Sequence, residues 1–94
     1  IMKFSVRIEL PKGNNTPYRL SVNAFERLGI QCSSAVDNPD EIQDTAKRII
    51  EHAFIELVSK ELPLAEVMEV FYSDSILYDN EVGILVEVNL FTVL

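Results

Sequence analysis

The sequence contains few of the residues from which small catalytic and metal sites are usually built. It has one cysteine, one histidine, no tryptophan and only three glycines in 94 residues. A lone cysteine excludes a disulfide within the chain, and a lone histidine leaves acid–base catalysis or zinc binding without a second histidine. The sequence has no phosphate-binding loop, dinucleotide fingerprint or nucleophile elbow. We therefore expect a protein that is not an enzyme and that uses no metal or cofactor.

Long apolar runs are also missing, although 48% of the residues are hydrophobic. No run approaches the roughly 20 residues of a membrane-spanning helix, so no membrane contact is expected. Lys3 and Arg7 interrupt the apolar residues near the start, unlike the pattern of a signal peptide. The hydrophobic content is too high for a disordered chain. We expect one cytoplasmic domain over residues 1–94, with no second domain.

Positive charge is scarce in the second part of the chain. The formal net charge is −7, and residues 1–36 hold five basic and two acidic side chains, a balance of +3. Residues 37–94 hold three basic and thirteen acidic side chains, a balance of −10. An acidic surface repels nucleic acid, so direct binding of DNA or RNA is not expected. It would attract a basic protein; the alternative is that these carboxylates only solvate a small domain.

The first 17 residues predict a strand followed by a hairpin loop. Residues 2–10 alternate strictly between apolar and polar side chains, which is typical of a strand with one buried face. Its apolar positions are Phe4, Val6, Ile8 and Leu10. Residues 11–17 are dense in proline, glycine and asparagine, which favour turns.

Two further strands are expected before the helix. A second alternating run covers residues 18–24, and a short third strand covers residues 30–34. Gly29 allows a bend between them. The competing interpretation is a short helix over residues 22–28 that is capped by this glycine. We favour the strand.

The segment from 36 to 62 predicts the helix around which the rest of the chain is organised. Asn38 is a suitable N-cap, and Pro39 suits the first helical position. Apolar residues then recur at helical spacing, and Pro63 is expected to stop the helix. The stripe consists of Ile42, Ala46, Ile49, Ile50, Ala53, Phe54, Leu57 and Val58.

After the helix, residues 66–72 and 83–94 predict two more strands, separated by an acidic loop at 73–81. The order is strand, strand, short strand, helix, strand, strand. This order predicts an α+β fold, in which a mostly antiparallel sheet of four or five strands carries one amphipathic helix on one face.

One helix covers one face of a sheet, so the other face is available for contacts. The outer face of the last strand carries Leu85, Phe91 and Val93, which we take as candidate contacts in a homo-oligomer. The acidic loop supplies Asp74, Asp79 and Glu81 as candidate contacts with a basic protein partner. His52 and Cys32 are interpreted as structural residues, because neither has partners in the sequence for catalysis or metal binding.

Three stretches of the chain resemble the N-terminal domain of HicB-type antitoxins. The opening MKFSVRIELP is similar to the first strand of that family. The passage from Gly29 through VDNPDEIQDTAKRIIEHAFIEL is similar to its short strand, capped turn and helix, and the closing ILVEVNL to its final strand. Most members continue into a DNA-binding segment that has no counterpart in these 94 residues, so the resemblance implies no DNA binding here.

The resemblance implies a sheet like a trimmed RNase H fold without nuclease carboxylates. It also implies a function: non-catalytic binding of a small basic toxin that cleaves mRNA, whose active surface the domain covers. A self-assembling structural or scaffold protein is the alternative, suggested by the apolar outer face of the last strand. A small-molecule or enzymatic module is disfavoured, because no convergent set of polar residues is evident.

Overall fold

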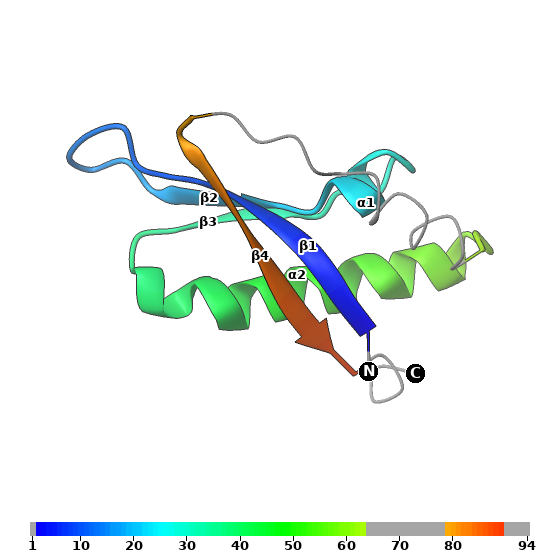
Figure 1. Ribbon diagram of the computed structural model, residues 1–94. Helices are drawn as coiled ribbons and strands as arrows, with labels where there is room; N and C mark the ends of the chain where they lie inside the picture. Colours follow the sequence, from blue (N-terminus) through cyan, green and yellow to red (C-terminus); the bar gives the residue numbers. More distant parts are fainter. Residues whose placement is uncertain (1, 64–78, 90–94) are drawn as a thin grey trace.

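The protein is an antiparallel sheet with one long helix on one face, which confirms the α+β class (Figure 1). The structure, a computed structural model, describes residues 2–63 and 79–89. The four described strands lie in the order β3-β2-β1-β4. The elements are β1 (Met2–Glu9), β2 (Tyr18–Ser21), α1 (Asn23–Glu26), β3 (Ser33–Val36), the 3-10 helix η1 (Pro39–Glu41), α2 (Ile42–Ser59) and β4 (Glu81–Val88).

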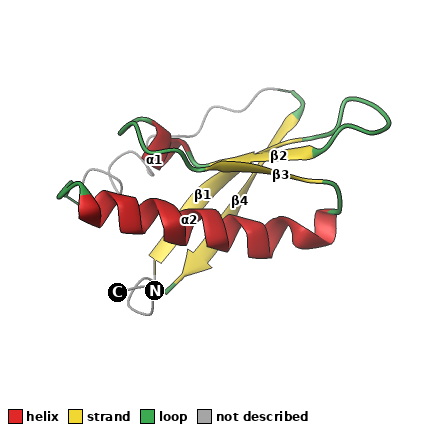
Figure 2. Ribbon diagram, turned by 180° about the vertical axis from the view of Figure 1, so that it is seen from behind, coloured by secondary structure: helices red, strands yellow, loops and turns green. Residues whose placement is uncertain are grey.

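Strand β1 lies between β2 and β4 among the described strands, and its alternating sequence gives it one buried face. It pairs with β4 over its whole length, from Met2 opposite Val88 to Glu9 opposite Glu81. Its apolar side chains turn toward α2 and are almost completely buried. Figure 2, seen from behind, shows α2 lying across this inner face. The polar side chains of β1 lie on the opposite face, which we call the outer face.

The strand expected over residues 18–24 is wrong beyond Ser21, where the chain turns into the short helix α1. The competing interpretation, a short helix capped by Gly29, is therefore confirmed. Gly29 N donates to Glu26 O at 3.0 Å and Ile30 N donates to Phe25 O at 3.1 Å, the two hydrogen bonds of a Schellman cap. Burial favours the helix over the strand, because the helix places Phe25 in the core, with its ring centroid 5.5 Å from that of Phe4.

Gly29 should be hard to replace for backbone reasons alone. Its φ is +76°, and a Cβ at this position would meet nothing within 4 Å. We therefore expect Gly29→Ala to lower the free energy of unfolding by about 1 kcal/mol, through left-handed backbone strain rather than a clash. Gly13→Ala is the matched control, because a Cβ there also meets nothing and φ is not positive. Urea denaturation of both variants tests this, and equal losses would contradict it.

Helix α2 begins as the sequence predicts but ends earlier. Asn38 Oδ1 accepts a hydrogen bond from Asp40 N at 2.9 Å, and Pro39 opens the 3-10 turn that leads into the helix. The helix ends at Ser59, four residues before the proline expected to stop it. Glu61 adopts φ 56°, and Leu62 N donates to Leu57 O at 3.1 Å, which closes a second Schellman cap.

In the last strand, β4, the predicted apolar side chains lie on the inner face of the sheet. Val86 and Val88 are buried, and Ile84 packs against the core. The strand starts at Glu81, two residues before the predicted start. The third strand is β3, Ser33–Val36, rather than residues 30–34. The strand expected over 66–72 lies outside the described residues.

Candidate functional site

The outer face of the sheet carries a polar pocket of about 440 Å³. Strands β1, β2, β3 and β4 all contribute to it. Ser21 and Ser33 face each other across β2 and β3, and their small side chains leave room above the sheet. The charged residues of the described lining are two arginines and two glutamates: Arg7, Arg19, Glu9 and Glu81. These formal charges cancel, so the pocket is not where the net negative charge of the protein is concentrated.

An ion pair crosses one side of this pocket. Arg7 Nε lies 3.9 Å from Glu81 Oε1, and the two side chains are only 18% and 11% exposed. Partial burial reduces solvent screening, so the pair ties β1 to β4 more firmly than a surface pair would. The carboxylate of Glu81 is therefore already neutralised by a neighbouring strand.

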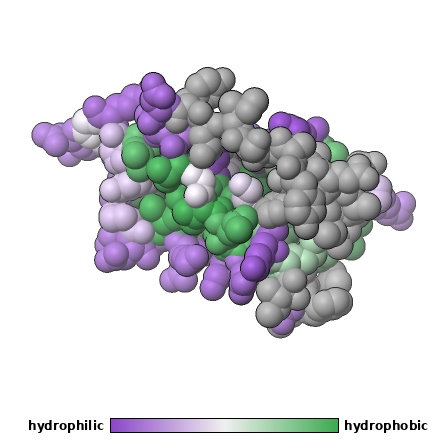
Figure 3. All heavy atoms as spheres, in the orientation of Figure 1, coloured by the Kyte–Doolittle hydropathy of each residue, from purple (hydrophilic) through white to green (hydrophobic). Residues whose placement is uncertain are grey.

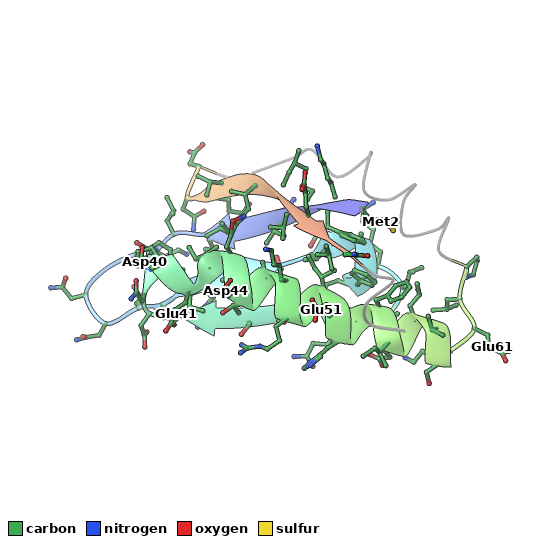
Figure 4. All side chains as sticks on the ribbon, turned by 90° about the horizontal axis from the view of Figure 1, so that it is seen from below. Met2, Asp40, Glu41, Asp44, Glu51 and Glu61 are labelled. Atoms are coloured by element: carbon green, nitrogen blue, oxygen red, sulfur yellow. The ribbon has the colours of Figure 1, made fainter. Side chains whose placement is uncertain are left out.

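A group of acidic side chains lies between β3 and the first turns of α2. Four carboxylates occur there within eight residues, and all four residues are exposed. We call this group the acidic end; it consists of Asp37, Asp40, Glu41 and Asp44. Figure 4 shows three of them gathered at one end of the helix, with Glu51 and Glu61 farther along the chain.

The carboxylates of the acidic end form no ion pair with any residue that the structure describes. The ion pairs found among those residues join Lys3 to Glu87, Arg7 to Glu81, Lys12 to Glu9 and Lys60 to Glu56. Although Lys47 and Arg48 follow in the next turn, neither is among these pairs. The positive end of the helix dipole favours acidic side chains at this place. The acidic end is therefore exposed to solvent and is stabilised by the helix dipole. Its carboxylates are available to an external cation.

The three carboxylates predicted as partner contacts have different surroundings. Asp74 lies outside the described residues. Asp79 is exposed in the turn before β4, whereas Glu81 belongs to the strand and pairs with Arg7. The acidic end was not singled out from the sequence. Four carboxylates within eight residues was the signal that could have identified it.

Of the three predicted oligomer contacts, Leu85 is 59% exposed on the outer face of β4. Phe91 and Val93 lie outside the described residues. The space-filling view shows an apolar area on this side, bordered by hydrophilic side chains (Figure 3). The exposed leucine leaves a contact of this kind open as a hypothesis.

Cys32 packs as a small buried residue, as the sequence predicts. It is 1% exposed, and its Sγ lies 3.5 Å from Ile49 O, to which the thiol can donate. Burial, and secondarily the carboxylate of Glu26, raise the pKa of the Cys32 thiol from 9.0 to about 12. The thiol therefore stays protonated and is a poor nucleophile at neutral pH. His52 lies on an exposed part of α2.

This raised pKa predicts a loss of stability in alkaline solution. Below pH 9 the Cys32 thiol is protonated in both the folded and the unfolded protein. Above pH 9 the thiol ionises in the unfolded protein but not in the folded one. The free energy of unfolding therefore falls until the pH passes the folded-state pKa of about 12. We expect the wild type to lose about 1 kcal/mol more than Cys32→Ala between pH 8 and pH 10. Urea denaturation at both pH values measures this difference. Parallel losses in the two proteins would contradict the raised pKa.

Comparison with known proteins does not assign this chain to a family. No family model matches it, and no curated protein or solved structure is significantly similar. The similarity to HicB-type antitoxins thus rests on the three short stretches of sequence. Within residues 2–63 and 79–89, no group of three or more metal-ligating side chains could hold an ion, and no helix is long and apolar enough to cross a membrane.

Proposed function

We propose that this domain is a non-catalytic, HicB-like antitoxin module that binds a small basic mRNA-cleaving protein in the cytoplasm and covers its active surface. The observation that carries the proposal is the acidic end, where four exposed carboxylates have no ion-pair partner among the described residues. A basic partner supplies the missing cations, and the charge of its RNA-binding surface is of the required sign.

Electrostatics supports binding that is fast and selective. Unpaired carboxylates on an exposed helix end attract a cationic partner over about 8 Å at physiological salt, before any contact forms. The same field repels RNA, so the domain does not compete with its partner for the substrate. Occlusion of a cationic RNA-binding surface needs no catalytic group on this chain.

The architecture agrees with the resemblance at the level of element order. The three similar stretches form a first strand (β1), a short strand with a capped helix (β3 and α2) and a final strand (β4), in the order that the resemblance implies. Among the described residues, α2 covers one face only, and no described element covers the outer face, the acidic end or the β3 side of the sheet. This agreement supports the proposal without identifying the partner.

RNA cleavage in the presence and absence of this domain tests the proposal. The gene beside this one is examined for a short frame that encodes a basic RNase, and that protein is assayed with purified domain added at equal molar amounts. Suppressed cleavage is the expected result, and addition of the same amount of an unrelated acidic protein is the control. Full cleavage at saturating domain would refute the antitoxin function.

A self-assembling scaffold remains the second candidate, favoured by the exposed apolar side chains of Leu85 on β4 and of Ile55 and Val58 on α2. Sedimentation of the isolated domain at increasing concentration separates the two. A stable homo-oligomer that leaves RNA cleavage unaffected would favour assembly, whereas a monomer that inhibits cleavage would favour the antitoxin. An oligomer that also inhibits combines both.

A further inference from the structure

Strand β3 lies at one end of the described strand order, so only β2 pairs with it among the described strands. Val22 N donates to Cys32 O at 2.9 Å, which marks a hydrogen-bonded pair just before the strand. Bonded and non-bonded pairs alternate along an antiparallel ladder. The pairs at Ser33 and Ala35 are therefore the non-bonded ones, and the N–H and C=O groups of these two residues point away from β2.

Strand β3 is only four residues long, but none of its residues is a lysine, a proline or part of a bulge that would protect this edge from a further strand. Sheet edges are usually guarded by lysine, proline, a bulge or a covering element. The strand reads Ser-Ser-Ala-Val, without lysine or proline, and its register with β2 is continuous over four pairs. Ser33 and Ala35 are both exposed, and their small side chains would not obstruct a neighbouring backbone.

The acidic end begins at the residue after β3. Asp37 follows Val36 directly, and the other three carboxylates follow within the next seven residues. A strand laid along β3 and extending past Val36 would enter this negative field. Charge complementarity therefore selects an extended segment with lysine or arginine rather than an acidic one.

We propose that the outward edge of β3 accepts an extended, basic strand of the protein partner, which lengthens the sheet while its cationic side chains reach the acidic end. This inference rests on the proposed function and deepens it by giving the conformation of the bound segment. Backbone hydrogen bonds supply the pairing, and the carboxylates supply the preference for basic sequences. The alternative occupants of the β3 edge are a second copy of this chain and a basic segment held by charge alone.

Amide hydrogen exchange of the ¹⁵N-labelled domain distinguishes these occupants. The probe is the capped synthetic peptide acetyl-(Lys-Val)₄-amide, which can form a strand. Acetyl-(Lys-Pro)₄-amide carries the same charge but lacks the N–H donor at every second residue, where proline also restricts the backbone. We expect the first peptide to slow exchange at Ser33 and Ala35 and the second to leave both unchanged. Exchange at Ser34 and Val36, whose amides already bond to β2, should change little with either peptide.

A proline variant gives an independent readout. Ala35→Pro removes an outward N–H that the sheet does not use, and proline is tolerated at such edge positions. We expect it to weaken binding of the Lys-Val peptide about tenfold, the scale of one or two lost hydrogen bonds. Ala35→Val keeps the N–H and should bind as the wild type does. Melting curves establish that both variants fold; if the proline variant does not, exchange in the wild type decides.

Three outcomes would overturn the proposal. Equal responses to both peptides, confined to residues 37–44, would mean attraction by charge alone. Amides of Ser33 and Ala35 that become protected without peptide as protein concentration rises would mean that a second copy occupies the edge. No response at these amides would exclude strand addition. None of these results depends on the RNA-cleavage assay. The proposed antitoxin function is therefore tested independently of strand addition at β3.

Discussion

Replacing Ile50 by alanine is expected to lower the free energy of unfolding by about 2–5 kcal/mol. Ile50 is 0% exposed and belongs to the hydrophobic core between α2 and the sheet. Truncation removes three buried carbons, and the surrounding residues cannot collapse into the space because strands and helix are fixed by their own hydrogen bonds. A domain of this size is stable by only about 5–14 kcal/mol, so the variant loses a large fraction of its stability.

Ile55→Ala is the matched control for this prediction. It makes the same chemical change on the same helix, but Ile55 is 48% exposed. The expected loss is below about 1 kcal/mol, because much of the side chain already contacts water. Urea denaturation of both variants gives the comparison. Similar losses at the two positions would mean that α2 does not pack on the sheet through the face that carries Ile50.

Neutralising the acidic end is expected to slow association with a basic RNase partner about tenfold at low salt. The variant Asp37→Asn with Asp44→Asn removes two of its four charges while preserving side-chain shape. Both residues are exposed, and neither forms an ion pair with a described residue, so the fold should be unaffected. Stopped-flow association measurements give the rate.

The control variant changes the net charge by the same amount at positions outside the acidic end. Glu51→Gln with Glu61→Gln also removes two negative charges, from the middle and far end of α2 (Figure 4). Its association rate should fall by less than about twofold, because screening confines the effect of a charge to its surroundings. Equal slowing by both pairs would show that overall charge, and not the acidic end, attracts the partner.

The sequence was most informative where one local signal dominated. Asn38 and Pro39 predicted the start of the helix, because a side-chain cap and a fixed φ act within three residues. Alternation in β1 and β4 predicted which side chains would be buried, since the period of a strand fixes its faces. These signals were sufficient for the fold class.

The errors arose where tertiary contacts decided between local alternatives. Residues 18–24 fit a strand by alternation, but the place for Phe25 beside Phe4 favoured a short helix from Asn23 onward. Glu81 was interpreted as an acidic loop residue, and only the pairing of β4 with β1 reveals that Arg7 neutralises it. Which carboxylates remain unpaired depends on the register of distant strands, and the local sequence does not encode that register alone.

We propose that charge at the acidic end drives binding of a basic protein. The most direct test is the dissociation constant of the domain with the neighbouring basic RNase, measured from about 50 to about 300 mM salt, over which the Debye length falls by more than half. The dissociation constant should rise at least about tenfold over this range in the wild type and much less in the Asp37→Asn, Asp44→Asn variant. An affinity that does not change with salt, or that changes equally in both proteins, would contradict the account.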